Sequence, residues 1–166
     1  MEHQPRRRAV CVPYSSTPAR RTNDGVAARL AGRTVFARMI LVTAGLIKKD
    51  GKLLIAQRPP AKHGALKWEF PGGKVEEDED PRACLAREIR EEMGIEIRVG
   101  NIVETVFHRY PDRSVLLLFY RCTWLSGEPQ AIECAAFAWV DPSELPAYDF
   151  LEADLDFIEK LSRGIL

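Results

Sequence analysis

The sequence has no long apolar run, no net charge and no closely paired cysteines, and each absence excludes a class of protein. No stretch approaches the roughly 20 apolar residues of a membrane-spanning helix, so no membrane partner is expected. A formal net charge of zero gives no indication of a nucleic-acid-binding protein. The cysteines, at positions 11, 84, 122 and 134, form no CxxC pair, which favours free thiols in a reducing compartment, with the cytoplasm as the default.

Charge is unevenly distributed along the chain. Residues 1–38 contain eight arginines against Glu2 and Asp24, a balance of +6, so residues 39–166 carry −6. The first segment lacks the apolar stretch of a secretory signal. We expect a disordered extension over residues 1–38, followed by one domain over residues 39–166. A mis-assigned start upstream of a true start at Met39, an organelle transit peptide and a nucleic-acid-binding arm are open explanations of the extension.

Five runs rich in aliphatic, β-branched and aromatic residues predict strands: residues 39–47, 52–58, 97–110, 113–124 and 136–140. The first two are joined through Asp50-Gly51, which is a hairpin signal. The third and fourth meet around Pro111-Asp112. Residues 141–146 read as a turn-rich loop.

Two segments predict helices. Asp80 followed by Pro81 is a helix start and Gly94 a stop, which gives a helix over residues 81–93. Its core-facing positions at 100° per residue are Leu85, Ala86, Ile89 and Met93. Residues 152–164 predict a second, amphipathic helix with Leu155, Ile158 and Leu161 on one side. This order of elements favours a mixed sheet flanked by helices over regular βαβ winding.

Three glutamates, Glu88, Glu91 and Glu92, share an arc of the first predicted helix. Like charges at this spacing repel by roughly 0.2–0.5 kcal/mol per pair. A solvated acidic face is the plain explanation, but the cluster also stands beside a glycine loop. Carboxylates that close together favour a neutralising cation, and Mg²⁺ typically combines a few carboxylates with substrate phosphates.

The same residues match a family signature. The Nudix box requires G, five residues, E, seven residues, R-E, an aliphatic residue, any residue, E-E, any residue, G and an aliphatic residue. The chain fills it with Gly73, Glu79, Arg87-Glu88-Ile89, Glu91-Glu92 and Gly94-Ile95. The chain therefore resembles the Nudix hydrolases, and the resemblance implies an α/β/α sandwich with a mixed sheet and a loop–helix–loop box.

The resemblance also implies a reaction, the hydrolysis of nucleoside diphosphates linked to another group with Mg²⁺ or Mn²⁺. By position, Glu88, Glu91, Glu92 and the carbonyl of Gly72 resemble metal ligands. Arg87 would orient Glu88, and Glu79 would support the helix. Glu133, in a loop near the last strand, occupies the place of an acid that binds a metal or activates water.

Further similarity over about residues 39–163 points to the MutT-type subgroup. It implies a nucleoside triphosphate substrate, a monomer or homodimer and no stable nucleic-acid partner. Arg58, Lys74 and Arg113 would contact phosphates, with an exposed strand end as the plain alternative for Arg58. Phe70 and Trp68 would line the pocket or belong to the core.

The base-reading position departs from the MutT pattern. Enzymes that hydrolyse 8-oxo-dGTP have an asparagine there, where this chain has Asp154. An ionised carboxylate only accepts hydrogen bonds, so Asp154 suits a base edge rich in donors. We expect sanitising of oxidised nucleotides such as 8-oxo-dGTP, with cytidine nucleotides as the alternative. Pro111, about sixteen residues after the box, keeps an ADP-sugar substrate open, and an RNA end or a non-catalytic regulator are further possibilities.

Overall fold

The computed structural model describes residues 39–166, and the predictions made for residues 1–38 lie outside this part. Its elements, in chain order, are β1 (Met39–Lys49), β2 (Lys52–Gln57), β3 (Trp68–Glu69), β4 (Gly72–Lys74), α1 (Pro81–Met93), β5 (Glu96–Arg109), β6 (Ser114–Ser126), β7 (Ala136–Val140), the 3₁₀ helices η1 (Pro142–Ala147) and η2 (Glu152–Asp154), and α2 (Leu155–Ser162). None of these helices is both long and apolar enough to cross a membrane.

Strand β1 lies at the centre of a mixed sheet. The strand order is β3-β2-β1-β6-β5, with β4 paired to β1 and β7 paired to β2. β1 runs parallel to β6 and antiparallel to β2 and β4, which confirms the predicted mixed sheet. The predicted hairpin between β1 and β2 turns at Asp50 and Gly51, whose φ angles of 49° and 84° suit an Asp-Gly pair.

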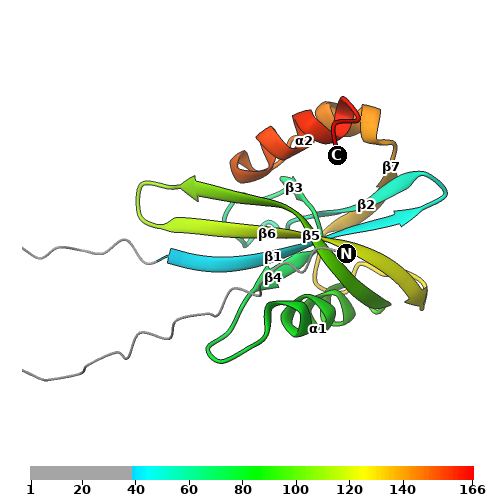
Figure 1. Ribbon diagram of the computed structural model, residues 1–166, viewed down its shortest axis with the longest axis horizontal. Helices are drawn as coiled ribbons and strands as arrows, with labels where there is room; N and C mark the ends of the chain where they lie inside the picture. The colour runs from blue at the N-terminus through cyan, green and yellow to red at the C-terminus, as the bar shows by residue number, and fades with distance from the viewer. Residues whose placement is uncertain (1–38) are drawn as a thin grey trace, which may run out of the picture. The chain divides into compact units, whose positions relative to one another are not determined.

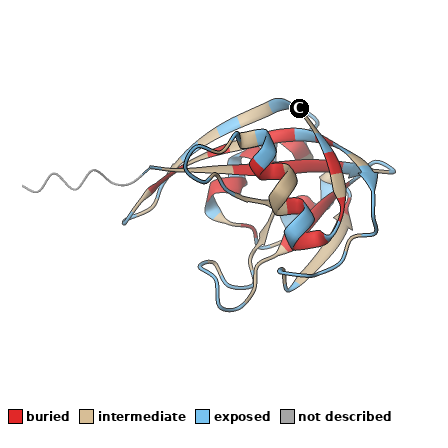
Figure 2. Cartoon of the chain, turned by 90° about the horizontal axis from the view of Figure 1, so that it is seen from below, coloured by how far each residue is buried: buried red, intermediate tan, exposed pale blue. Residues whose placement is uncertain are grey.

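The two faces of the sheet carry separate apolar cores. α1 covers one face, and α2 with η1 covers the other (Figure 1). The α1 side packs Leu54, Leu85 and Ile89, and the α2 side packs Phe119 and Phe157. Buried segments run through the sheet and along the inward side of the helices (Figure 2). The expected α/β/α sandwich is confirmed.

Helix α1 begins and ends where the sequence predicts. The Asp80 carboxylate accepts hydrogen bonds from the backbone N–H groups of Arg82 and Ala83, at 2.9 and 3.1 Å. Gly94 ends the helix with φ of 66°, a conformation that glycine adopts without strain. Of the four predicted core positions, Leu85, Ile89 and Met93 are fully buried, whereas Ala86 is only partly buried.

Three sequence predictions are corrected by the fold. The segment read as a turn-rich loop contains a 3₁₀ helix, η1, because Leu145 is drawn into the core. β3 and β4 escaped prediction, since strands of two and three residues show no periodicity. Leu155, predicted to share the buried side of the last helix, is 51% exposed, and Phe157 is buried with Ile158 and Leu161 instead. The reason is that η2 precedes α2, so α2 starts later than predicted and turns a different side inward.

Candidate active site

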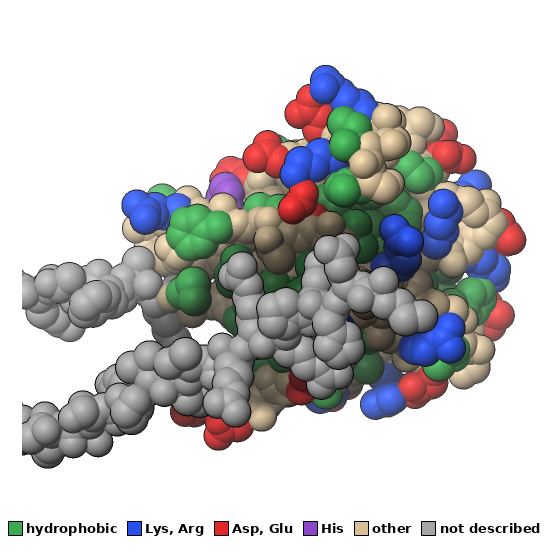
Figure 3. Space-filling view, viewed as in Figure 1, with side chains coloured by type: hydrophobic (Ala, Val, Ile, Leu, Met, Phe, Trp, Pro, Cys, Tyr) green, Lys and Arg blue, Asp and Glu red, His purple; other side chains and the backbone are tan. Residues whose placement is uncertain are grey.

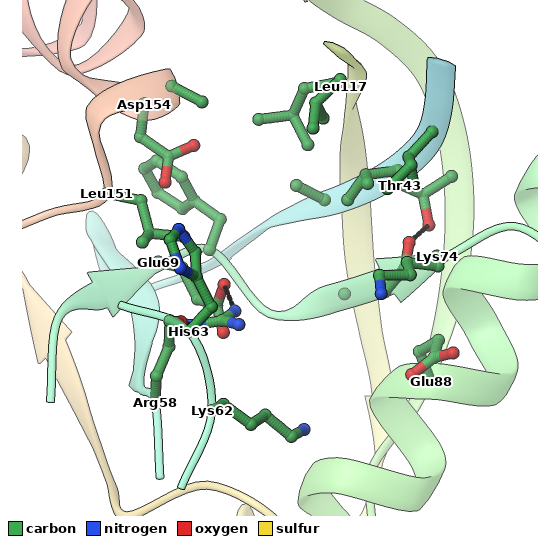
Figure 4. A pocket seen from close by; sticks show the side chains of 18 of the residues that line it. Thr43, Arg58, Lys62, His63, Glu69, Lys74, Glu88, Leu117, Leu151 and Asp154 are labelled. Carbon is green, nitrogen blue, oxygen red and sulfur yellow. Dashed lines mark hydrogen bonds and ion pairs between the residues drawn. The ribbon is translucent and has the colours of Figure 1, made fainter. Parts of the chain in front are cut away.

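A cavity of about 520 Å³ lies over β1 and β4, between α1, the β2–β3 loop, the β5–β6 turn and η2. This volume is in the range of small-molecule sites. We define its carboxylate end by Gly72, Gly73, Glu88 and Glu92, and its Asp154 end by Leu117, Leu151, Ala153 and Asp154. Glu88 and Asp154 lie on opposite sides of the cavity (Figure 4).

The two glycines let the backbone and the first glutamate approach one another closely. A Cβ atom on Gly73 would lie 2.2 Å from Cδ of Glu88, and one on Gly72 would lie 2.1 Å from the carbonyl oxygen of Thr43. β4 pairs here with β1, with Thr43 opposite Gly73. Any larger residue would therefore push the strand or the glutamate out of place, which explains the Gly-Gly pair.

Arg87 organises the acidic face of α1. Its guanidinium donates to both oxygens of Glu79 at 2.8 and 3.0 Å, to Glu88 at 2.9 Å and to Glu91 at 3.0 Å. The hydrogen bonds from Arg87 lower the pKa of Glu79 to about 2. Arg87 and Glu79 lie outside the cavity lining. Their contacts are those expected of residues that orient Glu88 and hold the helix against its loop.

Glu92 lies in a different environment from the other two helix glutamates. It is 9% exposed, and burial, with a contribution from Glu69, raises its pKa to about 7. Its ion pair among the described residues is with Lys62, at a loose 3.9 Å. A carboxylate that is buried and weakly neutralised is one that a hard cation would stabilise.

The predicted metal ligands are brought together in part. Glu88, Glu92 and Gly72 line the cavity, but Glu91 faces solvent with its carboxylate bonded to Arg87. Glu133 is exposed and outside the lining, although its backbone N–H donates to the carbonyl of Glu92 at 3.3 Å. Within residues 39–166, no three His, Cys, Asp or Glu side chains converge closely enough to hold a metal ion. The oxygen donors at the carboxylate end fit a hard divalent ion, and the full ligand set stays a prediction.

The predicted phosphate-contacting residues all line the cavity: Arg58, Lys74 and Arg113. Arg58 is already engaged, because Nε donates to the carbonyl of His63 at 2.7 Å and Nη1 pairs with Glu69. Arg113 bonds Asp112 at 3.0 Å. Lys74 is exposed at the end of β4 and has no ion pair among the described residues.

The two aromatic residues expected at the pocket, Phe70 and Trp68, have different positions. Phe70 lines the cavity and also belongs to the core, where its ring lies 5.9 Å from that of Phe119 and 5.8 Å from that of Phe150. Trp68 is not part of the lining. It packs edge-on against Tyr148, 5.1 Å away, so the core assignment holds for it.

Asp154 is 3% exposed and lines the inner end of the cavity. Burial raises its pKa well above the ordinary value, the nearby Glu69 raises it further, and Arg58 opposes both. The ionised form assumed from the sequence is therefore disfavoured. A neutral carboxyl donates one hydrogen bond and accepts others, as an amide does.

Four ionisable residues of the cavity were missed by the sequence analysis: Lys62, His63, Glu69 and Tyr110. A signal existed for Glu69, which is an acid between two aromatic residues at Trp68-Glu69-Phe70. Lys62 and His63 belong to a loop with no periodicity. Tyr110, at the β5–β6 turn, also lines the cavity, where its ring lies 5.7 Å from that of His63.

Comparison with known sequences and structures finds relatives of the chain. The sequence model of the NUDIX domain family matches residues 42–160 of the chain. CTP pyrophosphohydrolase of Escherichia coli is 42% identical over 122 residues, covering 74% of this chain and 90% of that protein. The 8-oxo-dGTP diphosphatase of the same organism is 33% identical over 127 residues, covering 76% and 98%. The crystal structure of MutT protein from Methanosarcina mazei Go1 superposes with a TM-score of 0.72 at 25% identity, covering 80% and 99%.

Proposed function

The chain belongs to the NUDIX family, and we propose that its cavity hydrolyses nucleoside triphosphates to a nucleoside monophosphate and pyrophosphate. One observation carries the proposal. A single cavity holds two carboxylates of the Nudix helix at one end and a buried hydrogen-bonding group, Asp154, at the other. A nucleotide has the matching polarity, with polyphosphate at one end and a base edge at the other.

The residues of the carboxylate end would act on the phosphates. Glu88 is held by Arg87, and Glu92 projects from the same helix beside Gly72. These oxygens would hold Mg²⁺ or Mn²⁺, which when bound offsets phosphate charge and activates water. Water attacks the phosphorus next to the α-phosphate. The bond from that phosphorus to the bridging oxygen breaks, and the monophosphate leaves with this oxygen.

The basic residues would balance the remaining phosphate charge. Lys74 is the most available of them, while Arg58 and Arg113 are partly engaged with Glu69 and Asp112. Glu91 and Glu133 would join the metal site through a rearrangement of their side chains, since both are exposed and adjoin the end of α1.

Oxidised guanine nucleotides such as 8-oxo-dGTP are the proposed substrates, in a role that would protect DNA by cleansing the cytoplasmic nucleotide pool. Cytidine triphosphates are the second candidate, because the relative named CTP pyrophosphohydrolase is 42% identical and the one named 8-oxo-dGTP diphosphatase 33%. A neutral Asp154 serves either base, because both present a donor beside an acceptor.

Three other activities have less support. The box is complete, which disfavours a non-catalytic regulator. Acidic and basic side chains are interspersed on the face in Figure 3, whereas an RNA substrate favours a concentrated basic surface. Pro111, the sign of an ADP-sugar substrate, is exposed in the β5–β6 turn, where proline is common in any case.

A nucleotide panel tests the proposal. Pyrophosphate release would be measured with Mg²⁺ and with Mn²⁺ for 8-oxo-dGTP, dGTP, CTP, dCTP and 5-methyl-dCTP, and AMP release for ADP-ribose, with the Glu88→Gln variant as the inactive control. We expect one triphosphate to exceed the others in kcat/KM. Absence of pyrophosphate from every triphosphate would contradict the proposed activity.

A further inference from the structure

The β2–β3 loop is held in one conformation by hydrogen bonds and presents one lysine, Lys62, to the carboxylate end. Its two ends are joined by hydrogen bonds from Arg58 N to Lys67 O at 2.9 Å and from Leu66 N to Arg58 O at 3.2 Å. Inside the loop, Lys62 N donates to Pro59 O at 3.1 Å. The Arg58 side chain bonds the carbonyl of His63, next to Lys62. The position of Lys62 is therefore fixed by the loop backbone.

The loop is also held against the opposite side of the cavity. Gly64 has φ of 69°, and a Cβ atom there would lie 2.5 Å from Cδ2 of Leu151. The loop thus packs on the segment that leads into η2 and Asp154. From this anchorage, the Lys62 side chain extends toward the helix that carries Glu88 (Figure 4).

The charges around Lys62 are divided unequally. Glu69 is paired with Arg58, and Glu88 with Arg87. Glu92 has Lys62, whose Nζ lies 3.9 Å from its carboxylate, beyond hydrogen-bonding distance. The Lys62 side chain is also 47% exposed, so the pair is weak and its geometry is easily changed. Of the three cations paired with these carboxylates, Lys62 therefore makes the weakest pair.

We propose that Lys62 is a further substrate-binding residue, which neutralises Glu92 in the metal-free protein and contacts the substrate's polyphosphate once a divalent ion takes its place at Glu92. A doubly charged ion in direct contact outcompetes a single charge at 3.9 Å. The Lys62 ammonium, on a flexible side chain, can then move to contact the phosphates. Arg58 is less free to do so, because its Nε and Nη1 are both already bonded. The polyphosphate part of the proposal rests on the proposed function.

The first measurement is metal binding without nucleotide. Mn²⁺ would be titrated into Lys62→Met and into the matched control Lys67→Met, a lysine of the same loop that pairs with Asp149 outside the cavity. Removing a weak, half-exposed competitor should tighten Mn²⁺ binding in Lys62→Met about two- to fivefold, on the scale of exposed ion pairs. Lys67→Met should match the unmodified protein. Equal Mn²⁺ affinity in the two variants would overturn the proposal.

The second measurement is the division between KM and kcat, on whichever of 8-oxo-dGTP and CTP is hydrolysed faster. Lys62→Met should raise KM about three- to tenfold, as expected for one lost phosphate contact, with kcat within about twofold. Lys62→Arg should restore KM, and Lys67→Met should leave it unchanged. An unchanged KM in Lys62→Met would overturn the proposal. If no nucleotide is hydrolysed, the proposed function fails, whereas the Mn²⁺ titration still decides the role of Lys62 at Glu92.

Discussion

The two ends of the cavity are built in opposite ways. The two glycines and two glutamates that define the carboxylate end come from one continuous segment, residues 72–92, in which strand β4 and the capped helix α1 place them. The Asp154 end gathers residues from β6 and from the segment ending in η2, which are more than thirty positions apart in the chain. Local sequence therefore specifies one end, and tertiary packing specifies the other.

The electrostatics of the two ends differ in the same sense. At the carboxylate end, Arg87 pairs with Glu88 and Glu91, and Lys62 pairs with Glu92. These side chains remain partly exposed to solvent. At the other end, Asp154 is 3% exposed, Glu69 and Arg58 shift its pKa in opposite directions, and no hydrogen bond from the described residues reaches its side chain. The carboxylate end therefore suits charged groups such as a metal ion and phosphates, and the Asp154 end suits a hydrogen bond to a neutral group such as a base edge. Five predictions test this contrast, from the largest expected effect to the smallest.

Loss of one cavity glutamate should have the largest effect. Glu88→Gln and Glu92→Gln should each lower kcat about a hundred- to a thousandfold, since the lost metal contact stabilises the transition state by several kcal/mol. Glu91→Gln should lower kcat less, because Glu91 is exposed and bonded to Arg87. Steady-state kinetics with the best nucleotide would measure this. Full activity in all three variants would remove the metal assignment.

Glu92 should also make stability depend on pH without metal. Its pKa is about 7 in the folded protein against an ordinary 4.5, so the folded protein binds more protons between these values. Stability should therefore fall by about 3 kcal/mol as pH rises from 4.5 to 7. Glu92→Gln should lose this part of the slope and be more stable above pH 7. Urea unfolding with chelator, with Glu91→Gln as the exposed control, checks it; identical slopes would contradict it.

At the Asp154 end the effect should depend on the base. Asp154→Ala should lower kcat/KM for the preferred nucleotide about ten- to a hundredfold, the value of one or two buried hydrogen bonds, and spare the others. Because a neutral carboxyl resembles an amide, Asp154→Asn should lose less than Asp154→Ala.

Three outcomes would change this picture. A greater loss in Asp154→Asn than in Asp154→Ala would show an ionised carboxylate that meets a donor-rich base edge. Improved 8-oxo-dGTP turnover in Asp154→Asn would favour a cytidine-type hydrolase in the unmodified protein. A uniform loss across the panel would remove Asp154 from the base contact.

The loop that joins the two ends gives a smaller effect. Gly64→Ala should destabilise the fold by about 2 kcal/mol, because a positive φ is combined with a contact on Leu151. Gly51→Ala is the matched control, since its φ is 84° but nothing lies within 4 Å, so strain alone should cost about 1 kcal/mol. Gly64→Ala should in addition raise KM. Equal unfolding midpoints and equal KM would show that the loop does not pack as described.

The smallest effect should come from removing residues 1–38. We expect kcat/KM to change by less than about twofold, since residues 39–166 by themselves supply the carboxylates, the cations and Asp154 that line the cavity. Kinetics of the shortened protein, with its fold checked by circular dichroism, would measure this. A tenfold loss would show that the arginine-rich segment contributes to the site.

The sequence by itself determined the family, the α/β/α fold and helix α1. Asp80, Pro81 and Gly94 define the helix through contacts within a few residues, and the spacing of Leu85, Ile89 and Met93 fixes which side is buried. The placing of Glu88 over Gly73 follows from the same short segment. Interactions of this range are encoded locally and can be predicted from the chain alone.

Only the tertiary structure decided how the glutamates and the far end differ. Glu91 and Glu92 are neighbours in sequence, yet one is bonded to Arg87 in solvent and the other is buried beside the β2–β3 loop. Asp154 is buried because η2 turns it inward before α2 begins, which helical periodicity does not reveal. Lys62 reaches Glu92 across thirty residues of chain. Burial and charge pairing depend on which segments fold together, and that is set by packing over the whole domain.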